Sequence, residues 1–583
     1  MLRRALVSAL VLGFAACAAP PQKPAAPPPA DPAAKALADG YIAAYFDRFP
    51  EQATEFGVPG RHHDKLTDNS LDALKAWEAR EDAWLVEAKA IDPSLIAGPP
   101  MRAAYAIARE ALESNIGSRV CRDELWNVSQ MTGWQVDDGY LVTIQPVGND
   151  QARAEALARW ALLPPYIDTE IVNLREGLKL GYTAPKESVK IVLDQINTLA
   201  TASPADSPFM SPVQRDQDPA FDKAFTTLVT SQLVPAFKRY REFLQKEYLA
   251  GAREAIAVSA NPQGSACYSA SVRYHSSLPV LATDVHALGL KEMDGITAEM
   301  KTIAERSFNT SDVPALLQKV RTDRQYMFKD RADLLAYTEA ALGRAKAAIP
   351  GWFGLKPKAD VRMEPYPKFR EKNAPNEYNP PAEDGSRSGL FYVSAYQAEK
   401  KSRAPQESTA FHETIPGHHM QMSIALERKE IHPIGRYIFN SGYVEGWALY
   451  AERLADEMKL YSSDLDRLGM LSGQAFRAAR LVVDSGMHTM GWTRQQAIDY
   501  MLAHTAEAKD DIASEVDRYI IYPGQATAYM LGELEIRRAR AAAQQTMGPK
   551  FDIKAFHDQV LEDGGVPLTF LSAKIKAWAE ANK

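Results

Sequence analysis

The sequence predicts a mainly α-helical protein, with one large helical unit over residues 35–583 and a small β-sheet. Apolar residues recur at intervals of three and four through most of the chain after Asp31, as they do on one face of a helix. Only two short segments have strand character, and no clear boundary divides the chain after residue 35. With 583 residues, 46% of them hydrophobic, the chain is long enough to bury a large core.

Helical spacing is clear in several ranges, and the chain from residue 439 to its end is largely helical in pattern. We expect a break at 461–464, where Asp464 could cap the helix that follows. The other predicted helices are 37–49, 70–90, 101–115, 152–177, 188–201, 219–249, 291–308, 313–349 and 407–429.

The two predicted strands are Tyr140–Gln145 and Ser388–Ser394, which are rich in β-branched and aromatic residues. A long irregular stretch, 363–387, precedes the second strand, and a run of histidines follows it. This order suggests that the second strand borders a site, where it could serve as an edge strand that pairs with an extended peptide.

The N-terminus has the pattern of a lipoprotein signal peptide over residues 1–16. Two arginines precede an apolar stretch, Ala5–Ala16, that is too short to span a membrane as a helix. The segment Leu12–Cys17 resembles the bacterial lipobox, in which the chain is cut just before a cysteine that carries the lipid. We therefore predict lipidation of Cys17; an ordinary cleaved secretion signal is the alternative.

Residues 17–34 are rich in proline and alanine, a composition typical of a semi-rigid tether. With Ala18 after the cysteine, the expected location is the bacterial cell envelope, anchored by the lipid in the outer membrane and facing the periplasm. No other stretch approaches 18 consecutive apolar residues, so the lipid is the only expected membrane contact. A net charge of −7 and a pI near 6 do not favour nucleic acid as a partner.

Two further cysteines, Cys121 and Cys267, form an even pair in a chain expected to reach an oxidising compartment. They could form a disulfide or remain two separate buried thiols, and the sequence favours neither.

The segment Thr409–Gln421 carries the strongest chemical signal in the chain. It holds His412, followed directly by Glu413, and then His418 and His419. In the usual zinc-peptidase motif, two histidines four residues apart bind the metal, and the glutamate beside the first acts as general base on the metal-bound water. Here the histidines are six or seven residues apart, so an unbroken helix does not fit the motif.

Helix geometry favours His418 over His419 as the second ligand. On an unbroken helix His419 would lie roughly 10 Å along the axis from His412, too far for two imidazoles to share one ion easily. Pro416 and Gly417 are residues that interrupt helices, and a bulge there would move His418 into the ligand position. We favour His412 and His418, and keep His419 as the alternative second ligand.

Glu445 is the predicted third ligand. It lies 27 residues after His418, at the start of an amphipathic segment. Its sequence neighbours are apolar, and burying a carboxylate among them costs free energy unless the carboxylate binds a cation. A surface glutamate at a helix start is the alternative. Glu452, two turns further on, could orient a ligand histidine or face solvent.

The two motifs together resemble the bacterial family known as domain of unknown function 885, which is itself similar to glutamate-zincin metallopeptidases. The resemblance implies a helical zincin-like catalytic unit, a bound Zn²⁺ ion and a small sheet bordering the active-site cleft. The residues that carry it are His412-Glu-x-x-Pro-Gly-His-His-x-Gln421 and Glu445-Gly-Trp-Ala-Leu-Tyr-Ala-Glu452.

Three residues of the C-terminal third are further candidates. His488 could donate a hydrogen bond to a substrate oxyanion, or be an ordinary core histidine. Arg518 could bind a substrate carboxylate, although a salt bridge between helices through Asp517 or Arg518 is an equal alternative. Tyr522 could also donate to the oxyanion.

These observations lead to the hypothesis of a zinc-dependent peptidase acting on short peptides, of carboxypeptidase or dipeptidase type, with Glu413 as general base. Two alternatives stay open. The same ligands could hydrolyse a non-peptide amide or ester, or the chain could be a non-catalytic periplasmic binding lipoprotein on a zincin scaffold.

Overall fold

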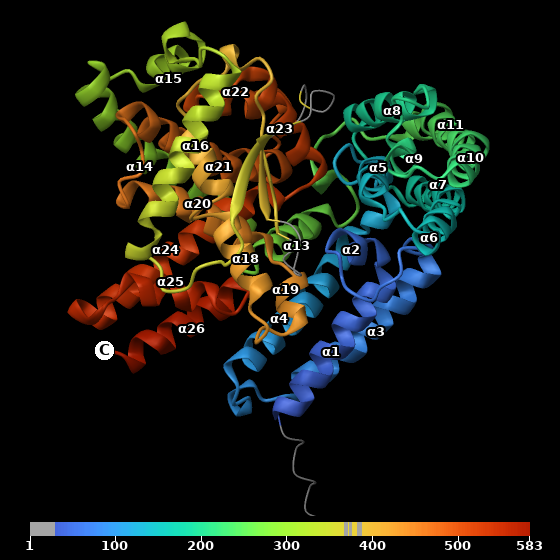
Figure 1. Ribbon diagram of the computed structural model, residues 1–583, viewed down its shortest axis with the longest axis horizontal. Helices are drawn as coiled ribbons and strands as arrows, with labels where there is room; N and C mark the ends of the chain where they lie inside the picture. The colour runs from blue at the N-terminus through green and yellow to red at the C-terminus, as the bar shows by residue number, and fades with distance from the viewer. Residues whose placement is uncertain (1–29, 367–370, 372–375, 382–387) are drawn as a thin grey trace, which may run out of the picture.

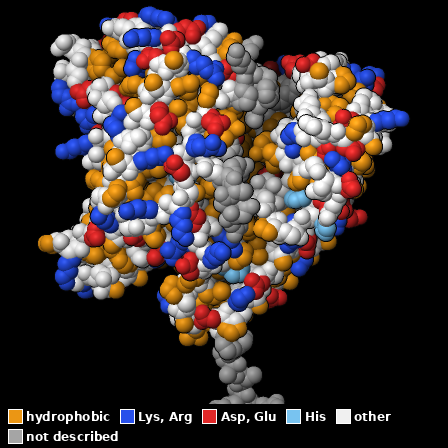
Figure 2. Space-filling model, in the orientation of Figure 1, with side chains coloured by type: hydrophobic (Ala, Val, Ile, Leu, Met, Phe, Trp, Pro, Cys, Tyr) orange, Lys and Arg blue, Asp and Glu red, His pale blue; other side chains and the backbone are white. Residues whose placement is uncertain are grey.

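The computed structural model describes residues 30–583 apart from 367–370, 372–375 and 382–387. The predicted signal peptide, Cys17 and most of the predicted tether lie outside the described residues. The chain forms two helical lobes, an N-terminal lobe coloured blue to green and a C-terminal lobe coloured green to red in Figure 1. Figure 2 shows positive and negative side chains interspersed over the visible face of both lobes.

The N-terminal lobe consists of helices with short connections. One long helix, interrupted only by π-helical turns at Val229–Leu233 and Leu244–Tyr248, covers the predicted range 219–249. The first π turn ends two residues before Pro235, whose ring cannot fit an unmodified α-helix interior. The helices of this lobe are α1 (Ala30–Arg48), α2 (Pro50–Glu55), α3 (Leu71–Ala90), α4 (Pro99–Ser118), α5 (Trp134–Ile144), α6 (Asp150–Trp160), α7 (Leu163–Leu180), α8 (Lys186–Thr201), α9 (Ser211–Arg215), α10 (Pro219–Leu228), α11 (Val234–Phe243) and α12 (Leu249–Gly251).

The C-terminal lobe is built around two helix pairs, in which α14 packs along α21 and α20 along α24. Helix α13 joins the lobes, because it packs against α4 on one side and against α20 and α24 on the other. The helices from there on are α13 (Gly264–Ser276), α14 (Ala282–Phe308), α15 (Val313–Thr322), α16 (Arg331–Ala348), α17 (Gln406–Glu413), α18 (His418–Glu427), α19 (Pro433–Tyr437), α20 (Ser441–Glu457), α21 (Asp464–Thr489), α22 (Arg494–His504), α23 (Lys509–Ile521), α24 (Ala528–Met547), α25 (Ile553–Leu561) and α26 (Leu568–Ala581).

A three-stranded sheet lies in front of the C-terminal helices (Figure 1), with strand order β1-β3-β2. Strand β3 (Gly389–Val393), which the sequence predicts, pairs in parallel with β1 (Val361–Pro365) and antiparallel with β2 (Glu377–Asn379). The expectation that β3 is an edge strand is therefore wrong, since both its edges are already paired. Strands β1 and β2 also occupy part of the stretch expected to be irregular.

Other expectations about single elements are corrected. Tyr140–Gln145 is not a strand: Leu141 and Val142 share a buried helical face of α5 with Trp134 and Asp138. The tether ends earlier than residue 34, because α1 begins at Ala30, and Asp31 in its first turn accepts hydrogen bonds from Ala97 and Gly98.

Two further corrections concern helix ends. The range 313–349 is two helices rather than one, and Asp330 caps the second, α16. Ser463, rather than Asp464, caps α21; its side chain accepts from the backbone of Leu465.

A disulfide joins Cys121 to Cys267, with their Cα atoms 4.6 Å apart. It links the end of α4 to α13, so of the two possibilities for these cysteines the structure shows the disulfide and not two separate thiols.

One hydrophobic core runs through both lobes. Among the described residues, no helix combines the length and the apolar character that crossing a membrane requires.

Candidate metal centre

The predicted metal motif lies where α17 ends and α18 begins. Helix α17 stops at Glu413, four residues form a turn, and α18 begins at His418. At Gly417 the backbone N–H donates to the carbonyl of Phe411 at 3.0 Å, and a Cβ atom there would lie 1.9 Å from the carbonyl oxygen of His412. Only glycine allows this approach, which keeps the two helix ends together.

Helix α20 closes the site from the other side. Trp447, fully buried, donates its indole N–H to the carbonyl of Pro416 at 3.0 Å and so holds the turn between α17 and α18. Gly446 packs on α24, where a Cβ would meet the backbone of Gly532 at 2.4 Å. This close backbone approach holds α20, and with it Glu445, beside the turn.

The structure brings His412, His418 and Glu445 together. Glu445 Oε2 lies 3.6 Å from His412 Nε2 and 3.5 Å from His418 Nε2. The two imidazole rings are almost perpendicular, with centroids 4.8 Å apart, and one ligand atom from each of the three residues lies within 4.8 Å of the other two.

These separations fit a tetrahedral metal ion. Nitrogen and oxygen ligands at about 2.1 Å from zinc lie roughly 3.4 Å from one another. Glu445 Oε2 is buried and accepts no hydrogen bond, an expensive arrangement for a carboxylate unless a cation occupies the space between it and the imidazoles. Two imidazoles and one carboxylate are also the donor set that a catalytic zinc site uses, with the fourth position left open.

The electrostatics of the group demand a positive charge at its centre. Burial alone would lower the pKa of His412, but its contacts with Glu445 and Glu452 outweigh burial and raise that pKa to about 9. Burial alone would raise the pKa of Glu445, but His412 and His418 hold it well below its usual range. Both shifts favour a positive charge between the imidazoles and the carboxylates.

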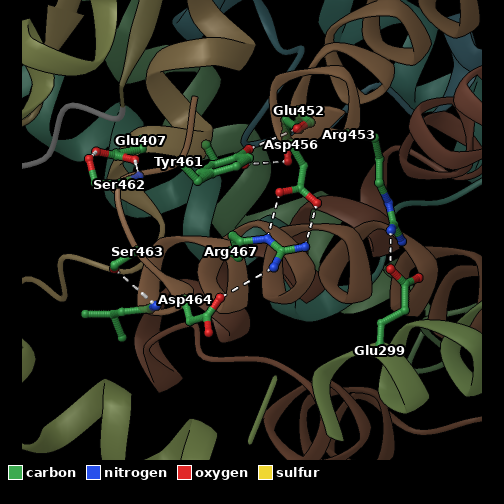
Figure 3. A network of polar contacts seen from close by, with 12 residues as sticks. Glu299, Glu407, Glu452, Arg453, Asp456, Tyr461, Ser462, Ser463, Asp464 and Arg467 are labelled. Carbon is green, nitrogen blue, oxygen red and sulfur yellow. Dashed lines mark hydrogen bonds and ion pairs between the residues drawn. The ribbon is translucent and has the colours of Figure 1, made fainter. Parts of the chain in front are cut away.

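Glu452 orients the first histidine. Its Oε1 accepts from His412 Nδ1 at 2.8 Å, its Oε2 accepts from Ser408 at 2.8 Å, and its side chain is buried. Tyr461 donates to the Glu452 carbonyl at 3.0 Å, as Figure 3 shows. Because Nδ1 is bonded to this carboxylate, Nε2 is directed at the metal position. Of the two roles that the sequence left open for Glu452, the structure shows the orienting one.

A wider polar network fixes the same helices (Figure 3). Arg467 of α21 binds Asp456 of α20 through two hydrogen bonds of 2.7 and 3.0 Å. Glu407 of α17 accepts from the backbone and hydroxyl of Ser462 at 2.9 and 2.6 Å. These contacts link the start of α17 to the loop that follows α20, and the end of α20 to the start of α21.

Glu413 follows His412 directly and makes no hydrogen bond to another side chain among the described residues. Burial, together with the nearby Glu445 carboxylate, raises its pKa, although His412 and His418 act against this rise. A partly accessible carboxylate with a raised pKa, beside the candidate ligands, is suited to accept a proton and release it again.

His419, the alternative second ligand, is directed away from this group. Its Nδ1 lies 2.9 Å from the Tyr378 hydroxyl and 3.2 Å from Ser423 Oγ, and its Nε2 donates to the Ala359 carbonyl at 3.1 Å. His419 therefore ties α18 to the sheet, and the helix break selects His418.

His488 is not placed for the oxyanion role. It is fully buried; its Nδ1 accepts from the Val258 backbone N–H and its Nε2 donates to the Tyr519 carbonyl, both at 3.0 Å. Neither nitrogen is free for a substrate, so the expectation of an oxyanion donor is wrong and the core-histidine alternative holds.

Arg518 is held by its own neighbours, Gln525 at 2.6 Å and Glu515 at 2.9 Å. The bridge between helices runs through Asp517, which binds Arg494 of α22 with hydrogen bonds of 2.6 and 2.8 Å. Tyr522 lines a cavity between the lobes, where burial raises its pKa to about 12.

Sequence reasoning missed Tyr529, on α24. Burial raises the pKa of its phenol, and the next largest cause is the carboxylate of Glu445. Tyr529 therefore lies in the electrostatic field of the candidate ligands His412, His418 and Glu445, which we call the metal group. The Arg480 guanidinium stacks on its ring at 4.4 Å. No motif marks this tyrosine, because it reaches the site from a helix 84 residues after Glu445.

The fold and the site define a class: a mainly α-helical protein with a two-histidine, one-glutamate group, of which His412 is buried and His418 and Glu445 are partly buried, beside a second, partly buried glutamate. The chain belongs to the family described as "Bacterial protein of unknown function (DUF885)", whose model matches residues 50–575.

Two solved structures share the fold. A candidate lipoprotein from Colwellia psychrerythraea is 24% identical, with a TM-score of 0.86 over 94% of this chain and 99% of its own. A candidate lipoprotein of unknown function from Shewanella oneidensis is 17% identical, with a TM-score of 0.73 over 93% of this chain and 99% of its own. Both likenesses show the fold that this chain shares with those proteins. No curated protein matches the chain.

Proposed function

We propose that this protein is a zinc-dependent peptidase. The observation that carries the proposal is the group of His412, His418 and Glu445, in which a buried carboxylate oxygen without a hydrogen-bond partner faces two imidazole nitrogens at 3.5 and 3.6 Å. Glu413 beside it favours an enzyme over a binding protein, because a structural metal site has no use for a proton acceptor.

His412, His418 and Glu445 would hold the ion, with Glu452 fixing the tautomer of His412. Zinc, when bound, would polarise a substrate carbonyl and make water a stronger acid. Glu413 accepts the proton of the attacking water and passes it to the leaving nitrogen. Tyr529, protonated over the physiological range because its pKa is raised, is our candidate donor to the developing oxyanion in place of His488.

We further propose short peptides as substrates, cleaved as by a carboxypeptidase or dipeptidase, in a protein anchored through Cys17 to the outer membrane and facing the periplasm. The cavity between the lobes that Tyr522 lines would favour small substrates over folded proteins.

The test is hydrolysis of a mixed di- to pentapeptide panel by the zinc-loaded protein, beside a panel of simple esters. We expect peptide cleavage that falls by roughly 10²–10⁴-fold in Glu413→Gln, with zinc content unchanged, because the variant removes a general base and no ligand. Cleavage of esters alone would replace the peptidase with the amide or ester hydrolase alternative. No turnover of either panel with zinc bound would contradict both.

A further inference from the structure

A cavity of about 930 Å³ lies between the helices of the N-terminal lobe and the ends of α13 and α23. We call it the acidic cavity, because the described residues that line it carry eight carboxyl groups and two arginine side chains, and none of them is a lysine. Its size is that of a binding pocket for several amino-acid residues.

The two arginines are already neutralised by neighbours. Arg119 binds Glu81 and Asp82 at 2.9 and 2.8 Å, and Arg122 binds Glu124 at 2.6 Å. No salt bridge to an arginine, lysine or histidine is found among the described residues for five other carboxyl groups of the wall. These are Glu51, Glu55, Asp123, Asp137 and Asp138.

Asp138 is the clearest unpaired group. It is 6% exposed, lines the acidic cavity, and has no hydrogen-bond partner among the described residues. Burying a carboxylate without a partner costs free energy unless a ligand or a proton compensates for the charge. A buried acid directed into a cavity therefore indicates a place for a cation.

The accessible carboxyl groups repeat the pattern. Surrounding protein and the Asp137 carboxylate raise the pKa of Glu55 to about 7, although Glu55 is exposed to the cavity. Desolvation by the surrounding protein, with Glu124 close by, raises the pKa of Asp123 to about 7, and the same cause, with Glu51 close by, raises the pKa of Asp137 to about 6, although both side chains are exposed to the cavity. The pKa of each of these carboxyl groups is raised by a neighbouring acid, and no cation nearby lowers it.

Aromatic side chains form another part of the wall. Trp77, Trp126, Trp134 and Tyr166 are among those that line the cavity. The faces of such rings attract ammonium and guanidinium groups, and they pack against the aliphatic stems of lysine and arginine.

The acidic cavity leads towards the metal group. Tyr274, His275 and Tyr522 line both this cavity and a neighbouring one of about 280 Å³, which extends to Ser441. Ser441 is the first residue of α20, about 6 Å along the helix axis before Glu445. A peptide lying in both cavities would have one end close to the candidate ligands.

We propose that the acidic cavity binds the positively charged part of a peptide substrate, so that the preferred substrates carry lysine or arginine side chains. This inference rests on the proposed peptidase function and names its substrate class.

The experiment measures peptide binding by isothermal titration calorimetry to the full-length Glu413→Gln variant in detergent, where turnover does not interfere. The probes are trilysine, trialanine and triglutamate. We expect trilysine to bind at least about tenfold more tightly than trialanine, triglutamate to bind most weakly, and added salt to reduce the difference.

Asp138→Asn and the accessible Asp137→Asn should each weaken trilysine binding several-fold. Asp72→Asn is the matched control, because Asp72 lies on α3 but its side chain is 99% exposed, and it should change nothing. Equal affinity for the three peptides, or trilysine binding that neither variant weakens, would overturn the inference.

Failure of the two proposals can be told apart. Hydrolysis of neutral and basic peptides at equal rates by the wild-type protein would overturn only the cavity inference. Selective trilysine binding without any peptide hydrolysis would overturn the peptidase function and still support a cation site.

Discussion

The metal group and the acidic cavity are both rich in carboxylates, but the partners of these carboxylates and the directions of their pKa shifts differ. In the metal group Glu445 and Glu452 are buried against imidazole nitrogens at fixed distances, and their pKa values are lowered despite burial. In the acidic cavity Asp137 and Asp138 lack such partners, and their pKa values are raised. The first arrangement positions one ion, whereas the second creates a negative field over a large volume.

The largest difference that we expect between the two regions follows from removing the disulfide, which should lower the stability of the protein but not its affinity for zinc. Cys121 and Cys267 lie beside the acidic cavity, joining segments that carry Asp123 and Tyr274 of its wall. Replacing both cysteines by serine should reduce the free energy of unfolding by about 2–4 kcal/mol, measured by denaturant titration. Zinc affinity should stay unchanged, since the metal helices do not depend on this link. A simultaneous loss of zinc would show that the two regions are one cooperative unit.

The next effect is on the metal group itself. Glu452→Gln removes the charge that fixes His412, and zinc affinity should fall by roughly 10–100-fold in a competition titration with a chelator. Glu457→Gln, on the same helix but 44% exposed and paired with Arg540, is the control and should bind zinc normally. Equal affinities for both variants would mean that His412 needs no orienting carboxylate.

The smallest expected effect is a gain in stability, when Asp138 of the acidic cavity is replaced by asparagine. Asp138 has a pKa raised by burial and by Glu51, Asp137 and Glu55, against which Arg159 is insufficient. Its folded state binds a proton more tightly than its unfolded state does, so stability falls as pH rises from about 4 through the folded pKa. Asp138→Asn should therefore raise Tm at pH 8, on the order of 1 °C, and leave it unchanged below pH 4. A lower Tm at pH 8 would mean that Asp138 has a stabilising partner.

Much of the metal group could be predicted from the sequence, because ligand chemistry imposes residue types and spacings. His412, Glu413 and Glu445 stand out in that way. The choice of His418 over His419 was favoured by Pro416 and Gly417, but the backbone path between the helices decides it, and no spacing rule specifies that path.

Other features could not be predicted, for physical reasons. Tyr529 and the wall of the acidic cavity are assembled from helices far apart in the chain, and each member is unremarkable in its own segment. Tyr140–Gln145 was misassigned because a short apolar run fits a strand and a buried helix equally well. Strand β3 was found, but its central place in the sheet depends on β1 and β2, which are too short and polar to be recognised.

Metal analysis by mass spectrometry tests the central claim most directly. It compares the full-length protein, purified in detergent and dialysed after zinc loading, with His418→Ala and His419→Ala. We predict about one zinc ion per chain in the wild-type protein and in His419→Ala, and almost none in His418→Ala. No zinc in the wild-type protein, or equal zinc in wild type and His418→Ala, would contradict the proposed metal centre and the peptidase function built on it.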